Sequence, residues 1–447
     1  MEVNFDKKNI LIAIFLVFLT VFLGYFTNQA DFLKISLGYC PFFLLYIYIL
    51  NRKNHVADVH FFVLTGIFLR FILIFSFPNL SDDIYRFIWD GRLLINGFNP
   101  FDHLPKYYIE QSVAVNGIDA QLFSNLNSPE YFTIYPPVAQ LTFAVAVWLF
   151  PHSIWGSAIV MKSCLFLFET GSILLIINIL KKLKLPVRNV LIYALNPLII
   201  IEICGNLHFE GGMIFFLLLS VFILIKIDDL TNRRLFYAAT AFALSIASKL
   251  LPLIFLPFFI KRLGWKKSVT FFSIIGVILL LLFIPLMNGV FIQNFGNSLN
   301  LYFQKFEFNA SIYYLFRWLG FKMIGWNMIA VIGPTLAICT PIAIFWMAFR
   351  EKINPSDWQS LFVKMLWAIC IYLFFTTTVH PWYIALPLVL CCFTKYRFPV
   401  VWSGLIWLTY INYSYPVYHE NLWIVGAEYL ILGIFLIYEG ILRHKFL

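Results

Sequence analysis

The stretch Ser81-Asp-Asp-Ile-Tyr-Arg-Phe-Ile-Trp-Asp-Gly-Arg-Leu-Leu-Ile-Asn-Gly-Phe-Asn-Pro-Phe101 follows an apolar segment that ends at Phe77. It holds three carboxylates and two arginines, which are Asp82, Asp83, Asp90, Arg86 and Arg92. Adjacent acids at a membrane boundary cost desolvation free energy, and they usually serve a function where they occur. The stretch therefore predicts where membrane-embedded chain gives way to a first large loop, and it makes that loop the first candidate for a functional site.

The remainder of the chain is apolar enough to lie in lipid. Of its 447 residues, 61% are hydrophobic and only 12% are charged, whereas ordinary globular domains carry about 25% charged residues. Apolar runs near the ~20 residues that a helix needs to cross a bilayer recur along the sequence. We therefore expect an all-α polytopic integral membrane protein, and the lipid bilayer is its first predicted partner.

The formal net charge of +10 suggests a nucleic-acid partner at first sight. Most of the 32 lysines and arginines, however, lie at the ends of apolar runs, as in Lys181-Lys-Leu-Lys184 and Lys261-Arg262. Such bunching is the positive-inside signal of membrane proteins, so it reports orientation. We therefore predict no nucleic-acid partner.

The apolar runs also predict the topology. Alternating them across the bilayer, with basic residues inside, gives about 12–14 transmembrane helices and two cytoplasmic termini. Residues 1–55 are expected to form two N-terminal transmembrane helices, residues 56–380 the membrane core, and residues 381–447 the C-terminal transmembrane helices. The core includes a large extracytoplasmic loop, residues 78–135, which carries short juxtamembrane helices. Residues 136–150 are too few to span comfortably and are expected to form a short helix at the outer leaflet.

This topology brings the unusual polar residues to one side of the membrane. Those that map to the outer boundary are Asp82, Asp83, Asp90, Arg92, Tyr135, His208, Glu210, Lys249, Asn309, Arg317, His380, Trp382 and Tyr383. Polar residues from separate segments that converge on one face of a lipid-embedded protein indicate a site.

Asp82 and Asp83 are candidates for a general base, because a carboxylate can accept the proton of an attacking hydroxyl. Two neighbouring acids also raise each other's pKa, which tunes one of them for that task. The alternative is a helix cap or a solvated loop acid, since Ser81 and the two acids precede a predicted helix at 84–95. The two roles are compatible, and Asp82 is placed ahead of Asp83 as the catalytic residue.

Arg86, Arg92 and Lys249 are candidates for binding a phosphate, since a charged leaving phosphate needs cations rather than a proton donor. Lys249 stands alone between two apolar helices, where it is either an anion ligand or a lysine that extends to the membrane boundary. The two arginines have an equally good alternative, which is an ion pair with Asp82 or Asp90 inside the loop. Asp90 joins them as a substrate-binding candidate.

Further polar and aromatic side chains are candidates for contacts with a sugar. Tyr135 opens the short outer helix, while His208 and Glu210 lie together at the end of a span. His380 and Tyr383 belong to an aromatic cluster at another outer end, where anchoring in the aromatic belt is the alternative, as it is for Tyr135. Metal binding needs more ligands than the His208–Glu210 pair offers. No cofactor is predicted, and a divalent metal is compatible with the acids but has no ligand spacing to support it.

Taken in order, these motifs resemble the type-C glycosyltransferase superfamily of integral membrane enzymes. Within it they are most similar to polyprenyl-phosphate-sugar-dependent mannosyltransferases, including the glycosylphosphatidylinositol mannosyltransferase I family and its bacterial relatives. The most specific part is residues 81–101 followed by Tyr135-Pro-Pro137. Support comes from Asn196-Pro197, Asn206-Leu-His208-Phe-Glu210, Lys249-Leu-Leu-Pro252 and His380-Pro-Trp-Tyr383.

The resemblance implies that an acid of the first extracytoplasmic loop is the catalytic base, and Asp82 and Asp83 occupy that position. The mannosyltransferase I relatives carry Asp-x-Asp before a tyrosine, whereas this chain has Asp82-Asp83-Ile84 before Tyr85, which leaves the base open between the two acids. The resemblance also implies a polyprenyl-phosphate-linked sugar donor, most often of mannose, a glycan or glycolipid acceptor, and inversion at the anomeric carbon. A bacterial inner membrane, with the site facing the periplasm, is the expected location.

Other functions fit parts of the same pattern. A transporter or flippase of a lipid-linked sugar often shows internal repeats and interrupted helices near the midplane, whereas the polar residues here gather at one boundary and no convincing repeat is visible. A transferase of another sugar, or an oligosaccharide ligase, fits equally well because sugar identity rests on a few hydrogen bonds. A non-catalytic assembly subunit fits less well, because the Asp82–Asp83 pair is intact.

Overall fold

The computed structural model describes residues 6–225, 230–304, 306–350 and 357–442. Within these residues all regular structure is helical, apart from one isolated bridge between Phe308 and Thr378. The all-α class is therefore confirmed. Eight helices of this part of the chain are long and apolar enough to cross a membrane. They are α1 (Lys7–Tyr25), α2 (Phe32–Asn51), α3 (Val56–Ile72) with a turn that extends it to Phe75, α8 (Ile154–Lys182), α14 (Trp265–Phe283) extended to Leu286, α17 (Ile329–Arg350), α18 (Trp358–Phe375) and α21 (Leu422–Ile437) extended to Gly440.

A ninth candidate span is broken. It joins Val187–Ala194 to Pro197–Gly205, with a bend of 50° between the two parts. Other apolar runs form helices that are shorter, such as α11 (Glu210–Leu224) and α12 (Asn232–Ser248). By length and composition the described residues thus give eight or nine spans, fewer than the 12–14 expected, because several runs counted as full crossings make short or interrupted helices.

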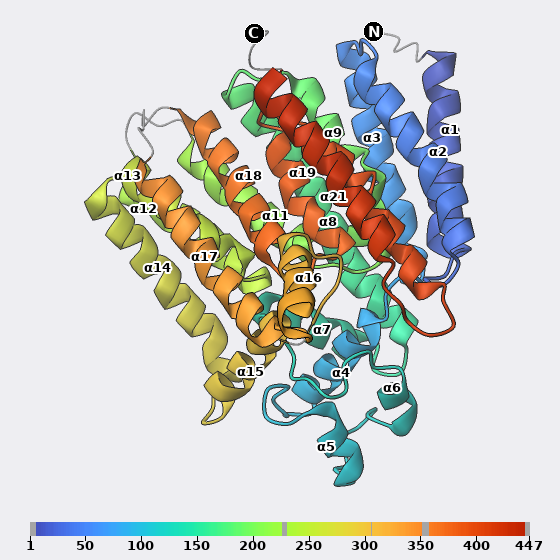
Figure 1. The fold of residues 1–447 in the computed structure, drawn as a ribbon, viewed down its shortest axis with the longest axis vertical. Coiled ribbons are helices and arrows are strands. Elements are labelled where there is room, and N and C mark those ends of the chain that lie inside the picture. The colour runs from blue at the N-terminus through green and yellow to red at the C-terminus, as the bar shows by residue number, and fades with distance from the viewer. Residues whose placement is uncertain (1–5, 226–229, 305, 351–356, 443–447) are drawn as a thin grey trace.

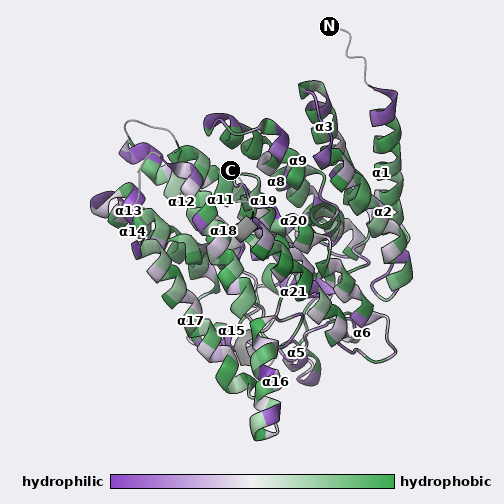
Figure 2. Cartoon of the chain, turned by 45° about the horizontal axis from the view of Figure 1, so that its top comes forward, coloured by the Kyte–Doolittle hydropathy of each residue, from purple (hydrophilic) through white to green (hydrophobic). Residues whose placement is uncertain are grey.

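The first large loop lies at one end of the molecule. In Figure 1 the start of α1 and the end of α21 are at the top, whereas α4 (Asp83–Ile95), α5 (Pro105–Glu110) and α6 (Ala120–Ser124) gather at the bottom. Figure 2 shows hydrophobic colour along most of the helices and hydrophilic colour concentrated at helix ends. This arrangement agrees with a membrane-embedded body that carries the acidic loop on the side away from the start of α1.

The short helix expected near residues 136–150 is present as α7 (Pro137–Leu149) and packs closely against α4. Phe87 of α4 stacks on Phe143 of α7, with ring centroids 4.5 Å apart. Gly91 makes this approach possible, because a Cβ at that position would lie 2.7 Å from the carbonyl oxygen of Phe143. The packing fixes the start of α4, and with it the two neighbouring acids, relative to the membrane-embedded helices.

A buried ion pair secures the broken span. Asn196 caps the second part, because its side chain accepts a hydrogen bond from the Leu198 N–H at 3.0 Å. The break leaves the carbonyls of Tyr193 and Ala194 to Arg70 of α3, which donates to them at 3.3 and 2.6 Å.

Glu169 of α8 balances the charge of Arg70 at 2.9 Å and accepts a 2.5 Å hydrogen bond from the Tyr193 hydroxyl. We call Arg70, Glu169 and Tyr193 the Arg70 cluster. A buried charge is tolerated only when it is paired and hydrogen-bonded, and Glu169 allows Arg70 to lie there and to bond the free carbonyls. The cluster therefore stabilises the break in the span. The second part of the span continues as a π-helix, Ile200–Gly205, and leads directly into the loop at residues 206–209.

Candidate active site

One cavity collects nearly all of the predicted site residues. Its volume is about 640 Å³, and it lies where the start of α4, the loop before α7, residues 207–210 and the end of α12 meet. Residues 306–308, 380–383 and two tyrosines near 415 complete its lining. The predicted residues that line it are Asp82, Asp83, Arg86, Tyr135, His208, Glu210, Lys249, His380 and Tyr383.

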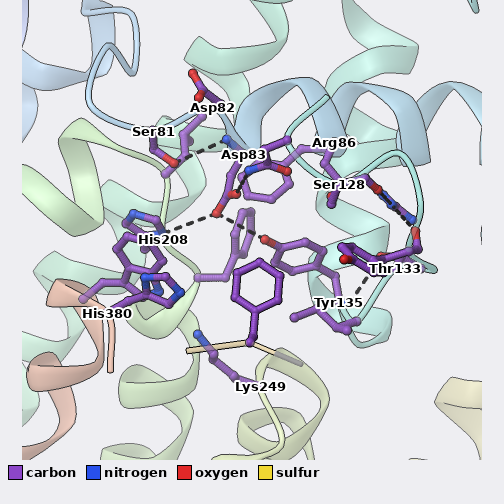
Figure 3. Close-up of a pocket in the computed structure, with 18 of the residues that line it drawn as sticks. Ser81, Asp82, Asp83, Arg86, Ser128, Thr133, Tyr135, His208, Lys249 and His380 are labelled. Atoms are coloured by element: carbon purple, nitrogen blue, oxygen red, sulfur yellow. Dashed lines mark hydrogen bonds and ion pairs between the residues drawn. The ribbon is translucent and has the colours of Figure 1, made fainter. Parts of the chain in front are cut away.

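Asp83 points toward the middle of this group, as Figure 3 shows. Its carboxylate accepts hydrogen bonds from the Asn127 amide at 2.8 Å and from the Tyr135 hydroxyl at 3.3 Å. A histidine nitrogen of His208 lies 3.9 Å away on a third side. Asp83 is therefore an anion held from several directions. We call Asp82, Asp83, Tyr135 and His208 the Asp83 cluster.

Asp82 has a different environment, although it is the next residue. It occupies the cap position of α4 without a capping hydrogen bond from its side chain, so the simple helix-cap interpretation does not account for it. Partial burial raises the pKa of the Asp82 carboxyl, and the charge of Asp83 raises it further. A carboxylate with a raised pKa holds an incoming proton more firmly, which is what a general base requires.

His208 lies against the cavity wall between two carboxylates. Its Nδ1 faces Asp83, and its Nε2 lies 3.4 Å from an oxygen of Glu202. The ring is only 3% exposed and stacks on Trp382 at a centroid distance of 3.6 Å. The preceding residue, Leu207, has a left-handed backbone with φ of 65°, which is rare for a side chain of this kind. The imidazole is thus fixed by packing on Trp382 and lies between two carboxylates, while its buried Nε2 makes no hydrogen bond within the described residues.

Lys249 brings a cation to the cavity, already paired. It follows the last residue of α12, and its ammonium contacts a carboxylate oxygen of the buried Glu210. The same ammonium lies over the ring of Tyr383, 4.7 Å from the centroid. An ammonium has three protons to donate, so the pair with Glu210 leaves it able to contact an anion in the cavity.

His380 belongs to an aromatic wall rather than to the charged groups. Its ring stacks between Phe308 at 4.7 Å and Trp382 at 4.5 Å. Burial, together with the nearby His208 and Lys249, lowers the pKa of His380 to about 3. The ring is therefore neutral at ordinary pH and acts as an apolar, polarisable surface.

The isolated bridge joins the two segments of the chain that form this wall. The N–H of Val379 donates to the Phe308 carbonyl at 2.8 Å, and the N–H of Phe308 donates to the Thr377 carbonyl at 3.1 Å. Two segments about seventy residues apart are thereby held in parallel beside the cavity.

Arg86 lines the cavity, but most of its hydrogen bonds serve the loop. Its Nε donates to Asp90 at 2.8 Å, and its Nη1 donates to the Tyr131 carbonyl at 2.8 Å. The ion pair with Asp90, offered as the alternative to phosphate binding, is therefore present.

Asp90 and Arg92 do not reach the cavity, so the structure does not support them as substrate-binding residues. Asp90 is fully buried and accepts a 2.9 Å hydrogen bond from Gln140. Arg92 donates to the carbonyls of Gly117 and Pro151. Both side chains hold the loop and α7 against α4.

Three other residues were predicted at the same outer boundary, and one of them lines the cavity. Trp382 lines the cavity, whereas Asn309 and Arg317, which were mapped to the same boundary, do not. Asn309 is buried against Glu428, and Arg317 pairs with Glu307.

Sequence analysis missed Glu202, a carboxylate that is 2% exposed and lies directly behind His208. A signal for it was present, since an acid inside an apolar run is a functional candidate by default. It also missed Asn127 and Tyr413, which line the cavity from segments with no distinctive motif. Within the ranges that the structure describes, no three His, Cys, Asp or Glu side chains are grouped so that they could hold a metal ion.

Comparison with protein-family models gives one match. The model is described as alpha-(1->6)-mannopyranosyltransferase, N-terminal domain, and it matches residues 33–263, just over half of the chain. The matched region contains both acids, Tyr135, His208 and Lys249. Comparisons with curated proteins and with solved structures give no match.

Proposed function

The chain belongs to the alpha-(1->6)-mannopyranosyltransferase family, and from that premise we propose that its cavity transfers mannose from a polyprenyl-phosphate donor to a glycan or glycolipid. Membership makes the protein a membrane-embedded mannosyltransferase of the type-C class. The donor, the acceptor and the catalytic acid are the content of the proposal. The observation that carries it is the contrast between two adjacent acids in one cavity. Asp83 accepts two hydrogen bonds, whereas the Asp82 side chain accepts none within the described part of the chain.

The proposed reaction is a single displacement. The acceptor hydroxyl gives its proton to Asp82 as its oxygen forms a bond to the sugar C1. The bond between C1 and the phosphate oxygen breaks at the same time, and the lipid phosphate leaves with the electron pair. Because attack and departure take place on opposite faces, the configuration at C1 inverts. Asp82 is preferred to Asp83 as the base because its pKa is raised, while Asp83 already accepts two hydrogen bonds.

Lys249 is the proposed partner of the leaving phosphate. A departing phosphate needs positive charge and donors rather than a proton, and Lys249 presents an ammonium at the cavity. Its partner Glu210 holds it in place and prevents it from extending to the membrane boundary. The proposed mechanism assigns the stabilising positive charge to Lys249 rather than to a metal ion.

The proposed location is a bacterial inner membrane with the cavity facing the periplasm. Basic residues such as Lys7 and Lys8 lie at the start of α1, and the acidic loop lies at the opposite end of the molecule. Because basic residues favour the cytoplasmic side, this arrangement supports cytoplasmic termini and a periplasmic site.

The test is transfer of label from polyprenyl-phosphate-mannose by the purified protein in detergent, with an extract of envelope glycolipids as acceptor. We expect Asp82→Ala to lower the rate by about 10²–10⁴-fold, the usual contribution of a positioned base. Glu130→Ala is the matched control, since Glu130 is an exposed acid of the same loop and its loss should leave the rate unchanged. Equal rates for wild type and Asp82→Ala would remove Asp82 from the mechanism. Donor binding without transfer by wild type would favour a transporter of the lipid-linked sugar.

A further inference from the structure

We propose that Glu202 is a positioning residue for this reaction, and that it acts through His208 to fix the Asp83 carboxylate beside Asp82. The inference rests on the proposed function, because it concerns the same cavity. It assigns a role to an acid that lies inside an otherwise apolar run and does not line the cavity.

Glu202 is held rigidly on the side away from the cavity. Its carboxylate accepts a 2.7 Å hydrogen bond from the Tyr410 hydroxyl and a 3.2 Å hydrogen bond from the Asn206 amide. A buried carboxylate without donors would be costly. The oxygen that accepts from Asn206, Oε2, also lies 3.4 Å from the Nε2 of His208. Glu202 is therefore placed to orient the imidazole.

The imidazole connects Glu202 to the acids. Its two nitrogens face two different carboxylates, Glu202 at 3.4 Å and Asp83 at 3.9 Å. Trp382 packs on the ring face at 3.6 Å and prevents it from rotating out of this plane. A histidine clamped between an anchored acid and a functional acid is a common positioning device, because the bond at one nitrogen sets the proton at the other.

The backbone around His208 is shaped for this placement. A π-helix carries Glu202, and π-helical turns are frequent at functional sites. Leu207 adopts a left-handed conformation one residue before the histidine. Strained conformations of this kind persist only where the surroundings determine them, and they cluster at active sites. The π-helix contains Glu202, and the left-handed residue directly precedes His208. The irregular backbone therefore sets the directions of these two side chains.

The consequence reaches Asp82 through Asp83. The Asn127 amide and the Tyr135 hydroxyl donate to the Asp83 carboxylate, and the His208 ring lies 3.9 Å away on a third side. These contacts keep the charge of Asp83 close to Asp82. That charge is one of the two causes that raise the pKa of Asp82. Loosening the histidine therefore lets Asp83 move and weakens the base, without touching a residue that contacts substrate.

The kinetic test uses Glu202→Gln, which keeps the shape and removes the charge. We expect kcat to fall by about tenfold or more while the donor KM stays within about twofold. Asp82 must be ionised to accept a proton, so activity falls as the pH drops through its pKa. If Asp83 drifts away, that pKa falls, and the acid limb of the pH–rate profile moves to lower pH. The other charged or titratable groups that face His208 are His380, which burial keeps neutral, and Lys249, which Glu210 balances.

A double-mutant cycle separates positioning from simple structural support. Under the proposal, Glu202→Gln combined with His208→Gln loses no more activity than His208→Gln alone, because the two act in series. Glu428→Gln is the matched control, since Glu428 is equally buried, accepts hydrogen bonds from Asn309 and Trp402, and lies outside the cavity. Its kcat should remain within about twofold of wild type. Losses that multiply in the double mutant, or an acid limb that does not move, would overturn the inference.

A spectroscopic arm keeps the inference testable if wild type transfers no mannose and the proposed function fails. In protein with isotope-labelled histidine, the His208 resonance is identified by its absence from His208→Gln. We expect its chemical shift to change in Glu202→Gln and in Asp83→Asn, and to stay the same in Glu428→Gln. An unchanged chemical shift in Glu202→Gln would show that Glu202 does not control the imidazole.

Discussion

The Arg70 cluster and the Asp83 cluster both place charge inside a membrane protein, yet they differ in how completely ion pairs and hydrogen bonds balance that charge. Arg70 and Glu169 are each 0% exposed, and between them they contact one another, the Tyr193 hydroxyl and the carbonyls at the break. In the Asp83 cluster, by contrast, Asp82 faces a cavity and its side chain has no hydrogen bond within the described residues. A charge whose ion-pair and hydrogen-bond partners are all present stabilises the fold, whereas a charge beside a cavity that lacks such partners is available for chemistry.

The largest effect should come from breaking the Arg70 cluster. Arg70→Met leaves the Glu169 carboxylate buried without its partner and the carbonyls of the break without a donor. Removing one partner of a buried pair typically costs about 3–5 kcal/mol, so we expect most of the protein to be lost from the folded fraction. The measurement is the yield of monodisperse protein in detergent and its thermal unfolding.

The matched variant for this prediction is Arg70→Met combined with Glu169→Met, because apolar replacement of both partners is often neutral or stabilising. It should recover part of the lost yield, short of all of it, since the carbonyls at the break remain unpaired. A single Arg70→Met variant as stable as wild type would mean that the cluster does not secure the broken span.

A smaller effect on stability should come from disturbing the close packing of α3 beside the same cluster. A Cβ at Gly66 would lie 2.4 Å from the carbonyl oxygen of Ala194, so Gly66→Ala must push α3 away from the break. Overpacking of this kind costs about 1–3 kcal/mol, measured as a lower midpoint of thermal unfolding. Gly276→Ala in α14 is the control, because nothing lies within 4 Å of the added atom. Equal midpoints for the two variants would show that α3 does not approach the break so closely.

The smallest effect should come from Asp83→Asn, and it should appear in activity rather than in stability. The amide keeps the shape but removes the charge that raises the pKa of Asp82. We expect the rate to fall about tenfold, equivalent to about 1.4 kcal/mol of transition-state stabilisation, with the acid limb of the pH–rate profile moved to lower pH. Asp82→Asn should lose more. The reverse order of the two losses would exchange the roles assigned to the two acids.

How far the sequence predicts the site follows from the same physics. Several residues that line the cavity were predicted as site residues because each is a polar residue at the end of an apolar run. They are Asp82, Asp83, Tyr135, His208, Lys249 and His380. Hydropathy alone places such ends on a common boundary. Asp90 was misassigned because loop residues cover it: Arg86 and Gln140 satisfy its carboxylate, and that covering depends on how the loop folds over α4.

The broken span shows where sequence reasoning stops. The run at 190–204 is apolar enough in the sequence for hydropathy alone to treat it as one crossing. The 50° bend, the π-helix and the left-handed Leu207 depend on contacts with Arg70 and Trp382, which lie far away in the chain. Glu202 carries a signal as an acid inside an apolar run, but its place directly behind His208 depends on the π-helix and the left-handed Leu207 between them.

The bridge between Phe308 and Thr378 has a consequence for redesign. The family match ends at residue 263. The part of the cavity that carries the two acids therefore comes from the matched region, while the aromatic wall of Phe308, His380 and Trp382 comes from the remainder. The wall is fastened by main-chain hydrogen bonds, which do not depend on side-chain identity. The shape of the cavity can therefore be remodelled, one wall side chain at a time, while the part that carries Asp82 and Asp83 is kept.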